Sequence, residues 1–172
     1  VTSLPGPAAC ITALTISGLA TRRFCFEAFL PVDKKERQWI LEELKTETRT
    51  MIVYEAPHHL RATLQELYQA LGDRSITLCR ELTKRYEEKK KMTLAQAVDY
   101  YRENDPRGEY VLVIAGKSKE EVMQEEQSRW EDLSIEEHMQ IYLDQDYSKK
   151  DAMKAVAKDR GVSKRDIYQA LL

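Results

Sequence analysis

Long hydrophobic runs are missing from this 172-residue sequence, and neither sign of charge dominates it. No apolar stretch approaches the ~20 residues of a membrane-spanning helix, and no basic segment leads into an apolar one as in a secretory signal peptide. Lys and Arg number 27 against 29 for Asp and Glu, which leaves a net charge of −2. We therefore expect a cytoplasmic protein with no membrane partner.

Cysteine and the common ligand-binding signatures are also scarce. The three cysteines form no Cys-x-x-Cys pair, and with three histidines they make no zinc-binding spacing, so we expect no metal site. The sequence contains no Gly-x-Gly-x-x-Gly, no P-loop, no Gly-x-Ser-x-Gly and no His-Glu-x-x-His. These absences argue against a Rossmann-type dehydrogenase or methyltransferase.

The distribution of charged residues divides the chain into two parts. A hydrophobic fraction of 42% with 33% charged residues is typical of a globular protein. Residues 120–146 carry ten acidic side chains and one basic one, whereas residues 147–172 carry seven basic and three acidic ones. Because the composition changes near residue 117, we predict one domain over 1–117 and a second over 118–172.

Residues 1–117 alternate between strand-like and helix-like segments. Near-continuous apolar strands between helices predict an α/β sheet covered by helices on both faces. Asp33 is placed to cap a helix whose apolar face includes Trp39. The lysine run at 89–91, together with Arg85-Tyr86, is interpreted as a solvated charged edge or, alternatively, an RNA-facing strip. Strands are expected at 1–4, 24–30, 50–54, 75–79 and 110–114, and helices at 8–17, 33–45, 57–71 and from Thr93.

Residues 118–172 are expected to be entirely helical. A small-residue turn around Gly161 fits a helix-turn-helix, and it fits a generic three-helix bundle as well. Ser163 with Asp166 resembles a capping box, and the basic excess favours contact with phosphate. His59 and His138 are expected on the surface. The helices are expected over 118–130, 134–144, 149–160 and 164–171.

Three polar clusters stand where ligands gather in α/β proteins, at the ends of strands. Pro5–Ala9 is either a close backbone approach to a ligand at a helix N-terminus or a tight turn only. Tyr54–His58 offers groups for acid–base chemistry, although the same groups could cap the next helix. Arg80–Lys84 is either a phosphate-binding site or a network of ion pairs.

Five motifs in this order resemble one family. The motifs are Leu4–Ala9, Phe26–Pro31, Tyr54–His58, Arg80–Lys84 and Gly108–Val113. Together they resemble the ribosomal RNA 2′-O-methyltransferases of the tetrapyrrole methylase superfamily, and residues 118–172 resemble the helix-turn-helix-like tail of those proteins.

The resemblance implies an architecture and an activity. It implies a mixed sheet covered by helices, the second of two α/β domains that enclose S-adenosyl-L-methionine, followed by the small all-α tail. The implied reaction is methylation of the 2′-hydroxyl of a cytidine in 16S rRNA of the 30S subunit, by a homodimer. Since the first domain is missing from the chain, we expect the chain to be inactive alone.

The resemblance also assigns site residues. Ala8 departs from a frequent Ser or Thr, which removes a possible side-chain hydrogen bond. The implied cofactor contacts are Pro5, Gly6, Ala8, Ala9, Tyr54, Glu55, Leu82, Val113 and Ile114. The ribose hydroxyl must lose a proton, and the catalytic candidates are Glu81, which we favour, Glu55 and His58. The residues expected to contact RNA are Arg80, Lys84 and Arg85, with Lys164 and Arg165 in the tail.

Two other functions remain open. A tetrapyrrole (precorrin-type) methylase of the same superfamily would act on a small macrocycle, but the Arg80–Lys84 motif and the helical tail argue against it. A non-enzymatic RNA-binding module would use the tail helices, and the full-length protein would then bind no cofactor.

Overall fold

A computed structural model describes residue 2 and residues 5–172 of the protein. The strand predicted over 1–4 lies outside the described residues, apart from residue 2. The chain forms two compact units, Val1–Lys117 (unit 1) and Ser118–Leu172 (unit 2). No helix among the described residues is long and apolar enough to cross a membrane.

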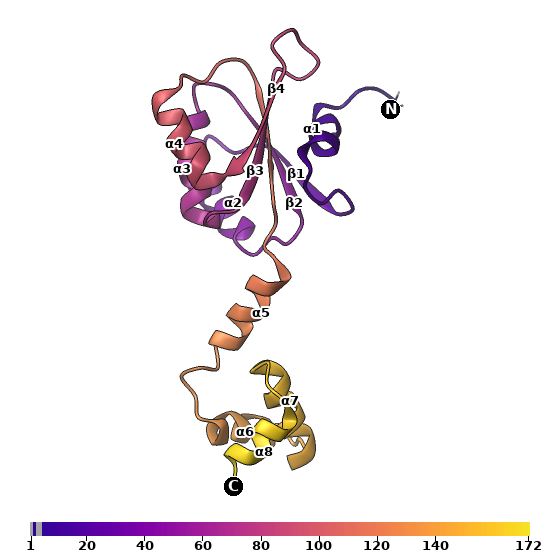
Figure 1. Ribbon diagram of the computed structural model, residues 1–172, viewed down its shortest axis with the longest axis vertical. Helices are drawn as coiled ribbons and strands as arrows, with labels where there is room; N and C mark the ends of the chain where they lie inside the picture. Colours follow the sequence, from indigo (N-terminus) through magenta and orange to yellow (C-terminus); the bar gives the residue numbers. More distant parts are fainter. Residues whose placement is uncertain (1, 3–4) are drawn as a thin grey trace. The chain divides into compact units, whose positions relative to one another are not determined.

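Local sequence signals explain where the helices of unit 1 begin and end. The elements are α1 (Ala9–Ser17), β1 (Phe24–Phe29), α2 (Lys34–Leu44), β2 (Thr50–Glu55), α3 (Leu60–Leu71), β3 (Ser75–Arg80), β4 (Glu88–Thr93), α4 (Leu94–Glu103) and β5 (Tyr110–Ile114) (Figure 1). Gly18 ends α1 with a left-handed φ of 74°. The Asp33 carboxylate caps α2, and Thr93 forms a capping box at the start of α4.

The five strands form one mixed sheet in the order β1-β2-β5-β3-β4. β1 pairs with β2 in parallel, whereas β5 is antiparallel to both of its neighbours, β2 and β3. The predicted mixed α/β sheet is confirmed. Because β2 and β3 both run opposite to β5, their carboxyl ends lie at the same edge of the sheet.

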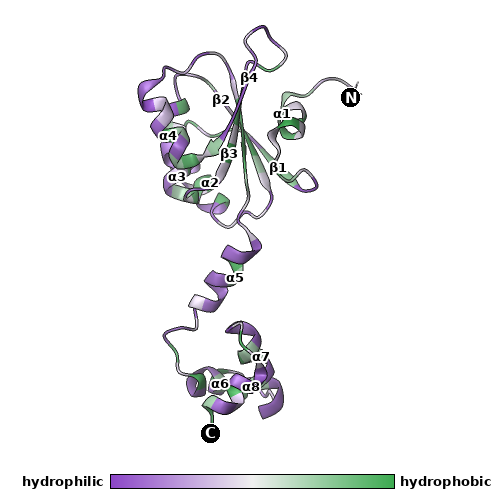
Figure 2. Cartoon of the chain, in the orientation of Figure 1, coloured by the Kyte–Doolittle hydropathy of each residue, from purple (hydrophilic) through white to green (hydrophobic). Residues whose placement is uncertain are grey.

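Apolar side chains are buried on both faces of the sheet. On the central strand β5, Leu112 and Ile114 pack with residues of α2, α3 and α4, a side that we call the three-helix face. Val111 and Val113 pack instead with α1, on the α1 face. Figure 2 shows hydrophobic residues concentrated in the inner strands of the sheet and in α1, whereas β4 is hydrophilic. Each fully buried aliphatic side chain stabilises the fold by about 1.5–3 kcal/mol.

Two predictions about unit 1 were wrong. β4 is a strand that the sequence reading missed, because its lysines have low strand propensity; its pairing with β3 overrides that preference. The strand is charged and lies at the edge of the sheet, where charge discourages further pairing. Trp39 does not face the core but is 62% exposed, because α2 buries Leu41 and Leu44 instead.

Unit 2 consists of helices, as predicted. The elements are α5 (Lys119–Ser128), α6 (Ile135–Leu143), α7 (Lys149–Asp159) and α8 (Lys164–Ala170). A serine hydroxyl caps each helix, and the Ser163–Asp166 box is complete. After α7, Gly161 takes a φ of 65°, and its neighbour Val162 donates from its backbone N–H to the carbonyl of Ala157 at 3.0 Å. This is the Schellman arrangement, which ends α7 and turns the chain into α8.

Candidate functional site

Two of the predicted polar clusters meet at one edge of the sheet. Glu55, the last residue of β2, and Arg80, the last residue of β3, both pair with Tyr110 at the start of β5. The clusters Tyr54–His58 and Arg80–Lys84 therefore lie one strand apart, although 21 positions separate them in the sequence.

The Pro5–Ala9 cluster lies near the carboxyl end of β2, because the residue that follows it is hydrogen-bonded to Tyr54. The Tyr54 hydroxyl accepts a hydrogen bond from the backbone N–H of Cys10 in the first turn of α1, at 3.0 Å. Burial is the main cause that raises the pKa of Tyr54, so the phenol stays neutral as an acceptor. This bond holds the turn that precedes α1 over the end of β2.

The start of α1 is open to a ligand. Its N-cap residue, Ala8, makes no side-chain capping bond, so first-turn N–H groups are left for another acceptor. Residues 5–9 are exposed, and a Cβ added to Gly6 would meet nothing within 4 Å. Packing within unit 1 therefore does not require glycine at position 6, whereas a closely approaching ligand would.

An aromatic group surrounds Tyr54 on the α1 face. The rings of Phe26 and Phe29 contact Tyr54 edge-on, with centroids at 4.9 and 5.7 Å, and both phenylalanines are exposed. Leu82 packs against the same apolar cluster, which also contains Val113. The sequence analysis does not name the two phenylalanines as site residues, although their spacing in the aromatic strand 24–29 could have indicated an exposed aromatic surface.

Two of the predicted cofactor contacts, Ile114 and Glu55, are separated from the residues around Tyr54. Ile114 is fully buried on the three-helix face, at the other end of β5. The Glu55 carboxylate is buried too, and it accepts from the Thr63 hydroxyl at 2.5 Å and from the Ala56 N–H at 2.8 Å. Arg37 donates in turn to Thr63 at 2.8 Å. The structure thus ties Glu55 to α3 and separates it from the residues around Tyr54.

Glu81 belongs to a charge cluster with Lys84 and Glu109. Its Oε1 accepts from the Glu109 N–H at 2.9 Å and from Lys84 Nζ at 3.2 Å, and Lys84 Nζ also lies 2.8 Å from Glu109 Oε2. These bonds, chiefly the one from the Glu109 backbone, lower the pKa of Glu81. The bonds to Glu109 and Glu81 raise the pKa of Lys84. Glu81 is therefore an anion whose geometry is set by its partners.

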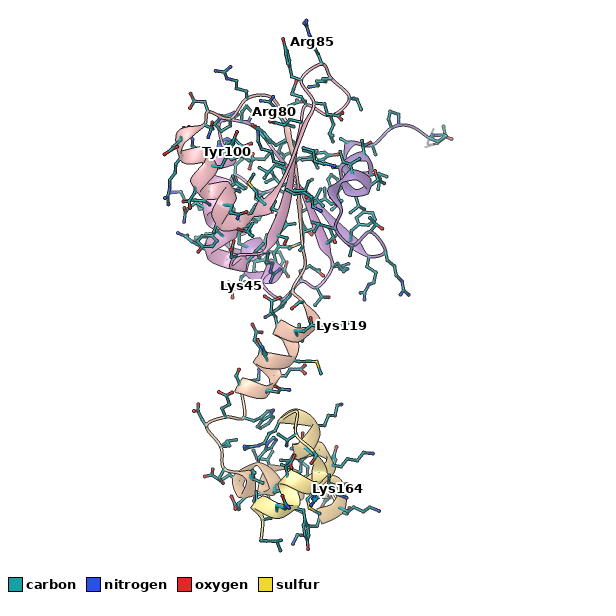
Figure 3. The ribbon with its side chains drawn as sticks, in the orientation of Figure 1. Lys45, Arg80, Arg85, Tyr100, Lys119 and Lys164 are labelled. Atoms are coloured by element: carbon teal, nitrogen blue, oxygen red, sulfur yellow. The ribbon has the colours of Figure 1, made fainter. Side chains whose placement is uncertain are left out.

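Arg80 does not join that cluster. Its side chain lines a cavity of about 320 Å³ with Tyr100, Tyr101 and Tyr110 (Figure 3 labels Arg80 and Tyr100). Arg80 Nε is buried without a hydrogen-bond partner, at 3.5 Å from the nearest Glu88 oxygen. The guanidinium is thus held between the Glu88 carboxylate and the Tyr86 carbonyl, which accepts from Arg80 Nη2 at 3.4 Å.

The three histidines have different surroundings. His58 and His59 are exposed just before α3, with ring centroids 4.1 Å apart. His138, predicted on the surface, is fully buried in unit 2 and stacks on Trp130 at 3.9 Å. Within residue 2 and residues 5–172, no group of three or more His, Cys, Asp or Glu side chains is arranged to hold a metal ion.

The predicted RNA contacts of unit 2 lie together on α8. Lys164 and Arg165 are exposed in its first turn, and only Ile167 of this helix is buried. The outer side of α8 therefore presents positive charge to solvent.

One family profile matches part of unit 1, and the related proteins match almost the whole chain. Residues 1–98 match the family profile "Tetrapyrrole (Corrin/Porphyrin) Methylases". "Ribosomal RNA small subunit methyltransferase I" of Halalkalibacterium halodurans is 45% identical over 98% of this chain and 57% of its own length. Proteins of the same name from Bacillus subtilis and Escherichia coli O157:H7 are 44% and 35% identical, over 99% and 100% of this chain and 58% of each relative.

The chain thus spans less than two thirds of these relatives. A solved structure of a cobalt precorrin-4 methyltransferase aligns with 61% of this chain and 46% of its own, at 17% identity and a TM-score of 0.44.

Proposed function

This chain belongs to the tetrapyrrole (corrin/porphyrin) methylase family, and we propose that it is the C-terminal part of an enzyme that methylates a cytidine 2′-hydroxyl in 16S rRNA. The observation that carries the proposal is the hydrogen bond from Cys10 to Tyr54, which brings the Pro5–Ala9 turn to the strand end where Leu82 also packs. The RNA substrate follows the printed names of the relatives.

The residues around α1 fit one side of S-adenosyl-L-methionine. The uncapped start of α1 and the open space at Gly6 suit the polar atoms of such a ligand. Pro5, Gly6, Ala8 and Ala9 would hold it through the backbone, and its methyl group would be the electrophile. The cofactor's apolar wall would be formed by Tyr54, Leu82 and Val113. Glu55 and Ile114 act as positioning residues through the sheet.

The residues that would orient the ribose hydroxyl and accept its proton lie where β2 and β3 end. A carboxylate with a lowered pKa holds a proton poorly, so Glu81 orients the ribose hydroxyl as a hydrogen-bond acceptor. His58 is exposed near the end of β2 and receives the proton that leaves. Positioning of the two reactants supplies most of the rate.

The RNA contacts spread over both units. Arg80 and Lys84 contact phosphates beside the reacting ribose, Arg85 extends this surface, and Lys164 and Arg165 add contacts from α8. The full-length protein works in the cytoplasm as a homodimer on the 30S subunit. We expect this chain alone to be inactive, because the family resemblance implies a cofactor site shared between two α/β domains.

The test is transfer of labelled methyl groups from S-adenosyl-L-methionine to undermethylated 30S subunits by the full-length protein. Gly6→Val lowers methyl transfer and cofactor affinity by about 100-fold, because it displaces the ligand. Tyr54→Phe removes the acceptor for the Cys10 N–H and lowers transfer by about 5-fold. Trp39→Ala, an exposed aromatic on α2, is the matched control with unchanged transfer.

The outcomes separate the alternatives. Label on a cytidine ribose supports the proposal, and label on a precorrin-type macrocycle supports the tetrapyrrole alternative instead. A full-length protein that binds RNA but no cofactor is a binding module.

A further inference from the structure

Tyr86 is exposed to solvent in the loop that joins β3 to β4. The residue is 64% exposed. Its ring belongs to neither apolar cluster of unit 1, and the Arg85 guanidinium carbon lies 5.6 Å from the ring centroid. Figure 3 shows Arg85 at the outer end of this loop, pointing away from the sheet. Packing within unit 1 therefore gives no reason for a large aromatic ring here.

The loop is held in a defined conformation. The Thr83 N–H donates to Glu87 Oε2 at 2.6 Å, and the Lys84 N–H donates to the Glu81 carbonyl at 3.0 Å. Thr83 has a φ of 63°, a left-handed conformation that is unfavourable for a β-branched residue and persists only where the surroundings impose it. The loop thus presents Tyr86 with little conformational entropy left to lose on binding.

Positive charge beside Tyr86 is not neutralised. Lys84 and Lys90 form ion pairs with glutamates. By contrast, Arg85, Lys89 and Lys91 are exposed, and the ion pairs found among the described residues of this hairpin involve Arg80, Lys84 and Lys90 instead. Lys89 and Lys91 project from the same face of β4, about 6.8 Å apart along the strand. A row of cations outside the glutamate ion pairs therefore continues from the exposed ring along β4, and the last of them, Lys91, lies against Gly18 at the end of α1.

We infer that this hairpin, residues 80–93, binds single-stranded RNA, with Tyr86 stacked on an unpaired base and Arg85, Lys89 and Lys91 contacting phosphates. Single-stranded RNA offers unstacked bases to aromatic side chains and phosphates to cations, which is the combination present here. An acidic peptide would satisfy the charges but would offer no base to the ring. The inference rests on the proposed function. It adds a contact with an unpaired base and contacts with RNA phosphates next to the RNA-binding residues proposed above.

The test compares two labelled probes on the 172-residue chain by fluorescence anisotropy. One is an unstructured oligoribonucleotide, and the other is an abasic ribose-phosphate oligomer of equal length. Tyr86→Ala weakens binding of the first by about 5- to 100-fold and leaves the second unchanged, whereas Tyr86→Phe retains the binding. Arg85→Ala weakens both probes and lowers the salt slope by about 1. Trp39→Ala, with similar exposure, changes neither.

The inference is overturned by no RNA binding by the wild-type chain, by equal loss on both probes in Tyr86→Ala, or by no loss at all. A polyglutamate peptide that binds as tightly as RNA and depends on Tyr86 also overturns it. The proposed function is judged separately by methyl transfer in the full-length protein. A Tyr86→Ala enzyme that methylates 30S subunits and binds RNA normally refutes only the hairpin contact.

Discussion

Unit 1 buries aliphatic side chains on both faces of a five-stranded sheet, whereas unit 2 has one small core that includes a buried histidine. His138 accepts at Nδ1 from Arg160 Nε at 3.1 Å, and Arg160 also donates to the Ser134 carbonyl at 3.0 Å. Unit 1 can therefore expose aromatic and charged groups at its edges without weakening its core. Unit 2 depends on individual polar contacts, and changes in them should act on unit 2 alone.

The two tryptophans allow this comparison to be measured, because Trp39 lies in unit 1 and Trp130 in unit 2. The Trp39→Phe background reports unit 2 by fluorescence, and the Trp130→Phe background reports unit 1.

The largest expected effect is in the core of unit 1. Leu112→Ala removes a fully buried side chain from the central strand and lowers the free energy of unfolding by about 3 kcal/mol. Urea denaturation followed through Trp39 measures this loss. Val32→Ala, at a highly exposed position in the same unit, should change it by less than about 0.5 kcal/mol. Equal effects of the two changes would contradict the assigned core.

The next effect belongs to unit 2. Arg160→Ala leaves His138 Nδ1 and the Leu133 carbonyl without the Arg160 donor, while the Ser134 carbonyl keeps the His138 N–H, and lowers the free energy of unfolding by about 2 kcal/mol. Denaturation followed through Trp130 should show the loss while the Trp39 signal stays unchanged. The exposed Arg165→Ala is the control. A loss seen equally by both tryptophans would mean that the units do not unfold independently.

Acid should weaken unit 2 through His138. Burial and the neighbouring Arg160 lower the pKa of His138 below its usual 6.5, so the unfolded chain takes up the proton more readily. Stability is unaffected above pH 6.5 and falls as the pH drops below it, by up to about 1.4 kcal/mol per pH unit. Urea denaturation through Trp130 at pH 7.5 and 5.5 measures the change. The difference between wild type and His138→Gln should shrink as the pH falls; a constant difference would refute the assignment.

The smallest expected effect is at a helix cap. Ser134→Ala removes the hydroxyl that accepts from the Glu137 N–H at 3.1 Å and should cost about 1 kcal/mol in unit 2. Ser134→Asp restores an acceptor and should recover most of that stability. If Ser134→Asp is as unstable as Ser134→Ala, the cap does not hold α6.

The candidate site could be predicted only in part. The sequence motifs pointed to Pro5–Ala9, Tyr54 and Leu82, and the structure places these near one another because the carboxyl ends of β2 and β3 coincide. It separates Glu55 from them, because neighbouring residues of a strand point to opposite faces. Which face each residue takes depends on the strand register, and this register is set by pairing with β5.

The sequence by itself determined the helices, their serine and aspartate caps and the apolar strands, because those signals act between residues a few positions apart. Only the tertiary structure decided that residues 88–93 form a strand, that Trp39 stands in solvent and that His138 is buried. The lysine strand depends on its pairing with β3, and the burial of His138 depends on its contacts with Arg160 and Trp130. Trp39 stays in solvent because α2 buries Leu41 and Leu44 instead. Non-local pairing and packing outweigh local preference there, because together they contribute more free energy than a residue's intrinsic propensity.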